Sequence, residues 1–221
     1  MSRPANPTTR ATLIEAAREE FTHKGLAESR IEEITRRAGT SKGAFYLHFE
    51  SKEELWDLIA REFLDGVLAM LASYEGIVCH EPGPHTLRLA LEADTAFSQY
   101  LWDNRAALRM VLEGGNGTPH ARLADEFVAA IDAYMTATVT RHQAMQAHFN
   151  ADMDPDVVAM FFTGAIHIFA RRILRAETPP DFRHVAVQLR KIMCGGLFLP
   201  EIGAAFSSAL NDLASVHPEA P

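Results

Sequence analysis

The chain has 221 residues, of which 48% are hydrophobic and 23% are charged, as in an average globular protein. This composition excludes a disordered or collagen-like chain, and the length allows one or two domains with a sizeable core. Charged residues interrupt the apolar stretches, so we expect no membrane-spanning segment, and residues 1–7 lack the apolar run of a secretory signal. With only Cys79 and Cys194, a disulfide scaffold is disfavoured and the reducing cytoplasm is the expected location.

The net charge of −8 is distributed unevenly. Residues 1–55 carry nine basic and nine acidic side chains, whereas residues 56–221 carry twelve basic and twenty acidic ones. Taken over the whole chain, this acidic charge argues against binding to nucleic acid. Within residues 29–48, however, four basic residues outnumber two acidic ones. The sequence therefore predicts a neutral N-terminal part with a locally basic segment, followed by an acidic part.

The segments between glycines and prolines have helical rather than strand periodicity, which predicts an all-α fold. The first helix is expected to begin near Thr8 and to end at Gly25 in a left-handed cap. Capping boxes at residues 29–32 and 51–54 predict the start of a second helix and of a long helix that runs to about Tyr74. Beyond a predicted loop over residues 76–84, helices are expected at 85–103, 104–113, 119–149, 155–176 and 181–212.

A short helix, a turn at Gly39 and a second short helix over residues 41–47 form a helix-turn-helix pattern between residues 29 and 48. In this motif the second helix enters the DNA major groove, while neighbouring side chains contact phosphates. Phe45 and Phe49 are expected in the core. The residues expected to face DNA are Arg30, Thr40, Ser41, Lys42, Gly43, Ala44, Tyr46, His48 and Lys52. The alternatives are that the lysines are ordinary solvated charges and that Tyr46 only packs. Arg36 and Arg37 are expected to supply general electrostatic attraction, or to have no role, rather than to contact bases.

The stretch over residues 41–53, Ser-Lys-Gly-Ala-Phe-Tyr-Leu-His-Phe-Glu-Ser-Lys-Glu, is close to a signature of a known family. Together with Ala16-Ala17, Phe21, Gly25 and Ala38-Gly39, it resembles the DNA-binding head of the TetR family of bacterial regulators. The resemblance covers roughly a quarter of the chain. Thr35, where the family usually has Ala, and Arg30, where it usually has a small hydroxyl residue, depart from the pattern. The resemblance implies three parts: a helix-turn-helix head (1–50), a connecting helix (51–75) and a helical body (76–221).

For the body, the resemblance implies dimerisation and binding of a small-molecule inducer. The segment 157–170 is apolar nearly all round, which suits a helix buried on two sides, as in a four-helix dimer interface. The alternative is a buried helix of a large monomer. The candidate interface residues are Val157, Phe161, Ala165, Ile168, Leu189, Met193 and Leu197. The candidate residues for a largely apolar pocket, each of which could instead belong to the core, are Phe97, Tyr100, Met110, Phe127, Tyr134, Phe162 and His167.

Other functions have less support in the sequence. Cys79, His80 and His85 are neighbours, but no spacing typical of a metal site occurs, and we expect no metal and no cofactor. An all-α enzyme would need a nucleophile with a base, a phosphate loop or metal ligands, and none is recognisable. A helical adaptor that has lost DNA binding is disfavoured by Lys42 and Tyr46. The sequence thus predicts a regulator, a repressor in the commoner case, that binds a palindromic operator as a homodimer and is released by an inducer.

Overall fold

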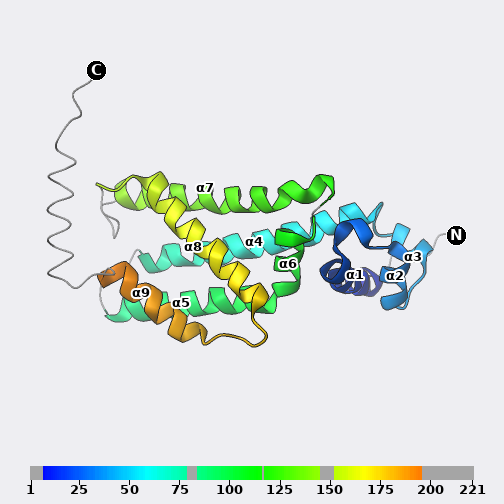
Figure 1. Cartoon of the computed structure of the whole chain (residues 1–221), viewed down its shortest axis with the longest axis horizontal. Coiled ribbons are helices and arrows are strands. Elements are labelled where there is room, and N and C mark those ends of the chain that lie inside the picture. The colour runs from blue at the N-terminus through cyan, green and yellow to red at the C-terminus, as the bar shows by residue number, and fades with distance from the viewer. Residues whose placement is uncertain (1–6, 79–83, 116, 145–151, 196–221) are drawn as a thin grey trace, which may run out of the picture.

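The computed structural model describes residues 7–78, 84–115, 117–144 and 152–195. Every regular element in these ranges is a helix, as Figure 1 shows, so the all-α prediction is confirmed for them. The helices are α1 (Pro7–Glu28), α2 (Ile31–Arg37), α3 (Lys42–Tyr46), α4 (Lys52–Val78), α5 (Pro84–Asp103), α6 (Arg105–Glu113), the 3-10 helix η1 (Pro119–Arg122), α7 (Leu123–Ala144), α8 (Pro155–Arg175) and α9 (Phe182–Gly195).

The molecule is elongated, with α1, α2, α3 and the start of α4 gathered at one end (Figure 1). We call this end the head, and the remainder, α5 to α9 with the rest of α4, the body. Helix α4 runs from the head into the body, where α5 lies beside it and α8 crosses the bundle next to α7. One buried cluster extends from Leu13 in α1 through Trp56 in α4 to Phe182 in α9. The head is therefore joined to the body by a shared core rather than by a loose linker.

The long helix predicted to end near Tyr74 continues to Val78, so the first residues of the expected loop are helical. The helix expected from residue 119 begins as the 3-10 helix η1 and is described as far as Ala144. The helix expected over 181–212 is described to Gly195, and residues 196–212 lie outside the described ranges.

One of the two predicted capping boxes is wrong. Helix α2 begins after Arg30, whose side chain does not cap it, because the hydroxyl of Ser29 donates instead to the carbonyls of Gly25 and Glu20. Ser29 therefore closes the end of α1. The second box is confirmed, since the Ser51 hydroxyl accepts from the amide of Glu54 at 3.1 Å. The Glu54 carboxylate reaches back to the backbone amide of Glu50 at 2.6 Å.

Gly25 interrupts α1 with φ 69° and ψ 178°, a positive φ with an extended ψ rather than the left-handed helical cap that the sequence predicts. Its position also brings the chain against the body, because a Cβ added there would lie 2.9 Å from the Gly114 carbonyl oxygen. Gly39, with φ 63°, has no atom within 4 Å of such a Cβ. Both glycines therefore have a positive φ that other residues rarely adopt, but only at Gly25 would an added Cβ also clash with a neighbouring atom.

We expect Gly25→Ala to lower the free energy of unfolding by about 2 kcal/mol or more, because the backbone strain and the clash with Gly114 add. Gly39→Ala should lose only about 1 kcal/mol, the cost of the left-handed conformation alone. Denaturant unfolding of both variants measures the difference. Equal losses would show that neither the extended ψ of Gly25 nor its close approach to Gly114 adds to the cost of a positive φ.

Helix α8 corrects the expectation about membranes. No Asp, Glu, Lys or Arg lies between Asp156 and Arg171, and by length and composition alone this helix could cross a membrane. The charged residues bound this apolar stretch at its two ends and do not interrupt it. In the structure α8 buries Ala159, Thr163 and Ala170 against the body and exposes an apolar face on the other side. Contact with the body accounts for the hydrophobicity of the buried face only.

Candidate nucleic-acid interface and ligand cavity

The helix-turn-helix is held in place by aromatic packing beneath α3. Phe45 is fully buried, and its ring contacts those of Tyr46 and Phe49 at centroid distances of 5.4 and 5.6 Å. The Ser41 hydroxyl accepts from the amide of Ala44 at 3.1 Å and so caps the first turn of α3. At Gly39 the positive φ lets the chain turn sharply between α2 and α3. As predicted, the two phenylalanines belong to the core.

The outer surface of the motif carries the residues predicted to face DNA. Arg30, Ser41, Lys42, Gly43 and Tyr46 are exposed, and the remaining four, Thr40, Ala44, His48 and Lys52, are partly buried. An open hollow of about 380 Å³ lies between the starts of α2, α3 and α4, and Arg30, Lys42, Tyr46 and Lys52 line it together. Four of the nine predicted residues therefore lie around one hollow, beside the carboxylates of Glu32, Glu50 and Glu53. Leu47, at 52% exposure, is a further apolar side chain on α3.

Most cations of the motif are paired with carboxylates within the head. The ammonium of Lys42 lies 2.6 Å from Glu32, and the side-chain hydrogen bond between them lowers the pKa of Glu32 and raises that of Lys42. Arg36 pairs with Glu33 at 2.6 Å in the same way. The guanidinium of Arg30 makes no ion pair with any described residue. A phosphate would therefore find Arg30 available but would have to compete with Glu32 for Lys42.

Lys52 has a partner that the sequence did not indicate. Its ammonium donates to the backbone carbonyls of Leu26, Ala27 and Ser29 at 2.7, 3.3 and 2.9 Å. These acceptors are main-chain atoms at the junction of α1 and α2, so no side-chain motif could reveal them. Lys52 thus ties the start of α4 to the end of α1, and its predicted contact with a phosphate stays a prediction.

The same junction is attached to the body. The amide of Leu26 donates to the carbonyl of Gly114, at the end of α6, at 3.0 Å. The Thr22 hydroxyl is 3.3 Å from the Ala106 carbonyl at the start of α6. Hydrogen bonds to two backbone carbonyls of the α6 region therefore connect it directly to α1.

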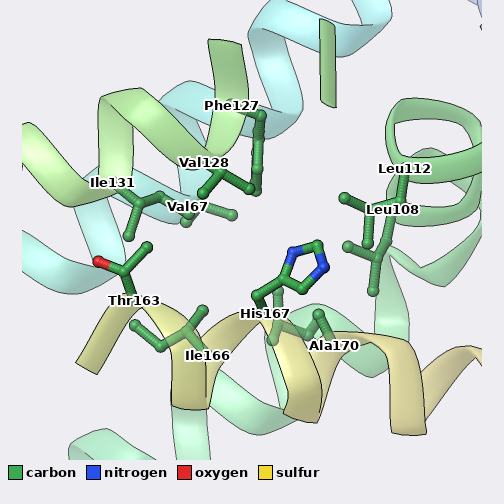
Figure 2. Close-up of a pocket in the computed structure, with 11 residues that line it drawn as sticks. Val67, Leu108, Leu112, Phe127, Val128, Ile131, Thr163, Ile166, His167 and Ala170 are labelled. Carbon is green, nitrogen blue, oxygen red and sulfur yellow. The ribbon is translucent and has the colours of Figure 1, made fainter. Parts of the chain in front are cut away.

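A small cavity lies in the body between α4, α5, α6, α7 and α8 (Figure 2). It measures about 10 Å³, room for about one water molecule. The lining residues are Val67, Leu101, Leu108, Leu112, Phe127, Val128, Ile131, Thr163, Ile166, His167 and Ala170. The guanidinium Nε of Arg171 donates to Nε2 of His167 at 2.8 Å. Burial, followed by the Arg171 charge, lowers the pKa of His167, so the ring is neutral at pH 7.

Comparison with known proteins decides the family. The model for "Bacterial regulatory proteins, tetR family" matches residues 13–59, which span α1, α2, α3 and the start of α4. The transcriptional regulator AcuR of Cereibacter sphaeroides is 30% identical over 194 residues, which cover 78% of this chain and 79% of AcuR. The chain belongs to the TetR family of transcriptional regulators.

Solved structures share the fold of this TetR-family chain along most of its length. NalD, the secondary repressor of the MexAB-OprM multidrug efflux pump of Pseudomonas aeruginosa, matches with a TM-score of 0.62 and 23% identity over 87% of this chain and 98% of NalD. FadR of Bacillus subtilis, solved in complex with stearoyl-CoA, matches with a TM-score of 0.62 and 15% identity over 85% of this chain and 99% of FadR. At these identities the likeness establishes the helical architecture.

Of the seven residues predicted for the pocket of this TetR-family regulator, Phe127 and His167 line the cavity. The other five do not. Phe97 and Met110 are buried in the core, and Tyr100 stacks on Phe63. Tyr134 packs against the core, and Phe162 contacts Phe161 edge-on. Large side chains at helical spacing serve packing first, whereas the cavity is lined mainly by aliphatic residues that the prediction omitted.

Exposed apolar side chains lie on both α8 and α9, and we refer to them together as the apolar face of these helices. Val157, Phe161 and Ile168 on α8 are 55%, 59% and 64% exposed, and Leu189 on α9 is 42% exposed. Met160, at 62%, and Ile192, at 38%, extend this face, and Ala165 is exposed between them. A Cβ at Gly164 would meet no atom within 4 Å, so another helix could approach closely there. The side chain of Met193 and all of Leu197 lie outside the described part of the chain.

No group of three metal-ligating side chains occurs within the described ranges. Two residues of the neighbouring Cys79, His80 and His85 lie outside these ranges, as does His148. His142 is buried in α7.

Proposed function

We propose that this TetR-family regulator binds a roughly palindromic operator as a homodimer and is released from it by a small, largely apolar molecule. The observation that carries the proposal is the hollow lined by Arg30, Lys42 and Tyr46 at the outer end of the head. Two such heads in one dimer would place their α3 helices in successive major grooves, about 34 Å apart. The acidic body would be repelled by the DNA backbone and would confine contact to the heads.

The apolar face of α8 and α9 supports the homodimer. Soluble monomers rarely leave large apolar side chains such as Phe161 and Ile168 together in water. In a symmetric dimer the same face would meet its copy, so that α8 and α9 from both chains form a four-helix interface. The predicted division into residues 1–50, 51–75 and 76–221 fits this arrangement, with α4 as the connection between the head and the body.

The path from ligand to DNA would run through α6. Leu108 and Leu112 line the cavity, and Gly114 at the end of the same helix accepts the hydrogen bond from Leu26. A ligand larger than the present cavity would push α6 away from α8 and thereby move α1 and α3. Release is then a population shift, whose size equals the difference in ligand affinity between the two arrangements. Repression is the expected outcome, and NalD is a relative of this fold that is named a repressor.

The test is selection of operator from random DNA by the full chain, followed by titration of the recovered site in increasing salt. We expect a palindrome whose half-sites are about one helical turn apart. Because several phosphates are contacted per dimer, the affinity should fall by about three orders of magnitude or more between 50 and 200 mM salt. Recovery of no common sequence, or a complex insensitive to salt, would favour the alternatives, an all-α enzyme or a helical adaptor.

A further inference from the structure

The cavity wall is apolar except on one helix. Among the described residues that line it, the only polar side chains are those of Thr163 and His167, one turn apart on α8. Because Nε2 of His167 accepts from Arg171, the neutral ring carries its proton on Nδ1. Figure 2 shows the ring extending from α8 into the space between Val128 and Leu108. Nδ1–H of His167 is therefore a hydrogen-bond donor of fixed position in a wall that, apart from Thr163, is apolar.

Near His167, one hydroxyl lacks a hydrogen-bond partner and one guanidinium lacks a carboxylate partner. The Thr163 hydroxyl is buried and has no hydrogen-bond partner among the described residues. The partly buried guanidinium of Arg171 donates to His167 but has no carboxylate partner in the described ranges. An oxygen atom in the cavity could accept hydrogen bonds from the Thr163 hydroxyl and from Nδ1–H of His167. A negative charge on this oxygen would also compensate the charge of Arg171, which is hydrogen-bonded to the other side of the imidazole.

We propose that the ligand of this cavity is an apolar molecule with a single carboxylate, one oxygen of which accepts a hydrogen bond from Nδ1–H of His167. This inference rests on the proposed function, which makes the cavity the inducer site. The apolar part of the ligand replaces contacts of Leu108, Val128 and Ile131, and it must widen a cavity that now holds about one water. A cation of the same length is disfavoured, because it meets the like charge of the partly buried Arg171.

The experiment is isothermal titration calorimetry of the full chain with three probes of equal length: decanoate, 1-decanol and decyltrimethylammonium. Decanoate is expected to bind about tenfold or more tightly than decanol, because its hydrogen bond is charge-assisted, and decyltrimethylammonium more weakly than both. In His167→Leu the advantage of decanoate over decanol should vanish. His167→Gln, which keeps an N–H donor, should retain part of it. Thermal melting of each variant verifies that it is folded.

Thr138→Val is the matched control, because the Thr138 hydroxyl on α7 is also buried without a partner but does not line the cavity. Its probe affinities should equal those of the unaltered chain. Failure of decanoate to bind, equal binding of decanol, or an unchanged preference in His167→Leu would each overturn the proposal. If decanol or decyltrimethylammonium instead releases the selected operator, the proposed function survives without the carboxylate. If the chain selects no operator, the proposed function fails, while calorimetry still decides the class of ligand.

Discussion

Replacing Lys42 by Met is expected to weaken operator binding by about a hundredfold. A charge-assisted hydrogen bond to phosphate or to a guanine edge contributes about tenfold, and each dimer would lose it twice. Tyr46→Ala should have an effect of similar direction, because the exposed hydroxyl is then removed from the same face. Fluorescence anisotropy of the selected operator at several salt concentrations measures both the affinity and its salt slope. For Lys42→Met the slope should fall by about two, one phosphate for each head.

The partner of Lys42 provides a test of opposite sign. Glu32→Gln frees the ammonium from the carboxylate at 2.6 Å and removes a negative charge beside the DNA, so operator affinity should rise, most clearly at low salt. Glu33→Gln is the control, since it frees Arg36, which we do not place at the base edges. A lower affinity in Glu32→Gln would mean that the pair shapes the head rather than competes with DNA. Unaltered binding in both Lys42→Met and Tyr46→Ala would overturn the assignment of residues 41–47.

If the proposed homodimer forms through α8 and α9, Phe161→Glu is expected to convert it to monomers and to abolish operator binding at concentrations that saturate the unaltered chain. Its ring is 59% exposed in the single chain, so the substitution removes little of the core. In the dimer, two carboxylates would be buried near the two-fold axis without partners. The loss of DNA binding follows because two linked heads bind one operator far more tightly than two separate heads. Light scattering and anisotropy measure the two effects.

Leu87→Glu serves as the control for this substitution. Leu87 is an exposed apolar residue of α5, 44% exposed, and it lies outside the face formed by α8 and α9. Its variant should keep the mass of the dimer and its affinity for DNA. A stable dimer of Phe161→Glu would place the interface elsewhere, whereas monomers of both variants would indicate general destabilisation, which thermal melting detects.

The head could be predicted closely from the sequence because its structure is determined locally. Gly39 fixes the turn, Ser41 and Ser51 cap the helices that follow them, and Phe45 anchors α3 beneath its exposed face. The prediction failed at Ser29. Its hydroxyl could either accept from an amide of the following helix or donate to a carbonyl of the preceding one, and in the structure it donates to carbonyls of α1. It also missed the carbonyls around Lys52, since backbone acceptors carry no signature in the side-chain pattern.

The cavity could not be located from the sequence for a different reason. Leu108 and Ile131 have the same spacing and chemistry as neighbours that fill the core, so their pattern does not distinguish a wall from a packed layer. Which helices leave space between them depends on their crossing angles, which single residues do not specify. Aromatic and Met residues were predicted to line the pocket because they are large. For Phe97 and Met110, the same large size lets them fill the core rather than line the cavity.

The backbone of Leu26 makes a hydrogen bond on each side: its amide donates to the Gly114 carbonyl of the body, and its carbonyl accepts from the Lys52 ammonium of α4. Since Leu26 takes part through its backbone atoms, neither hydrogen bond depends on which side chain stands at position 26, although the second one needs the ammonium of Lys52. It does require glycine at 114, where a Cβ would lie 2.5 Å from the ring of Trp56. A hybrid regulator that joins this head to the sensor of a relative should therefore exchange α1 to the start of α4 as one piece, and should take a sensor that keeps this glycine. Under those conditions, a new operator specificity can be combined with a new signal without redesigning the contact between them.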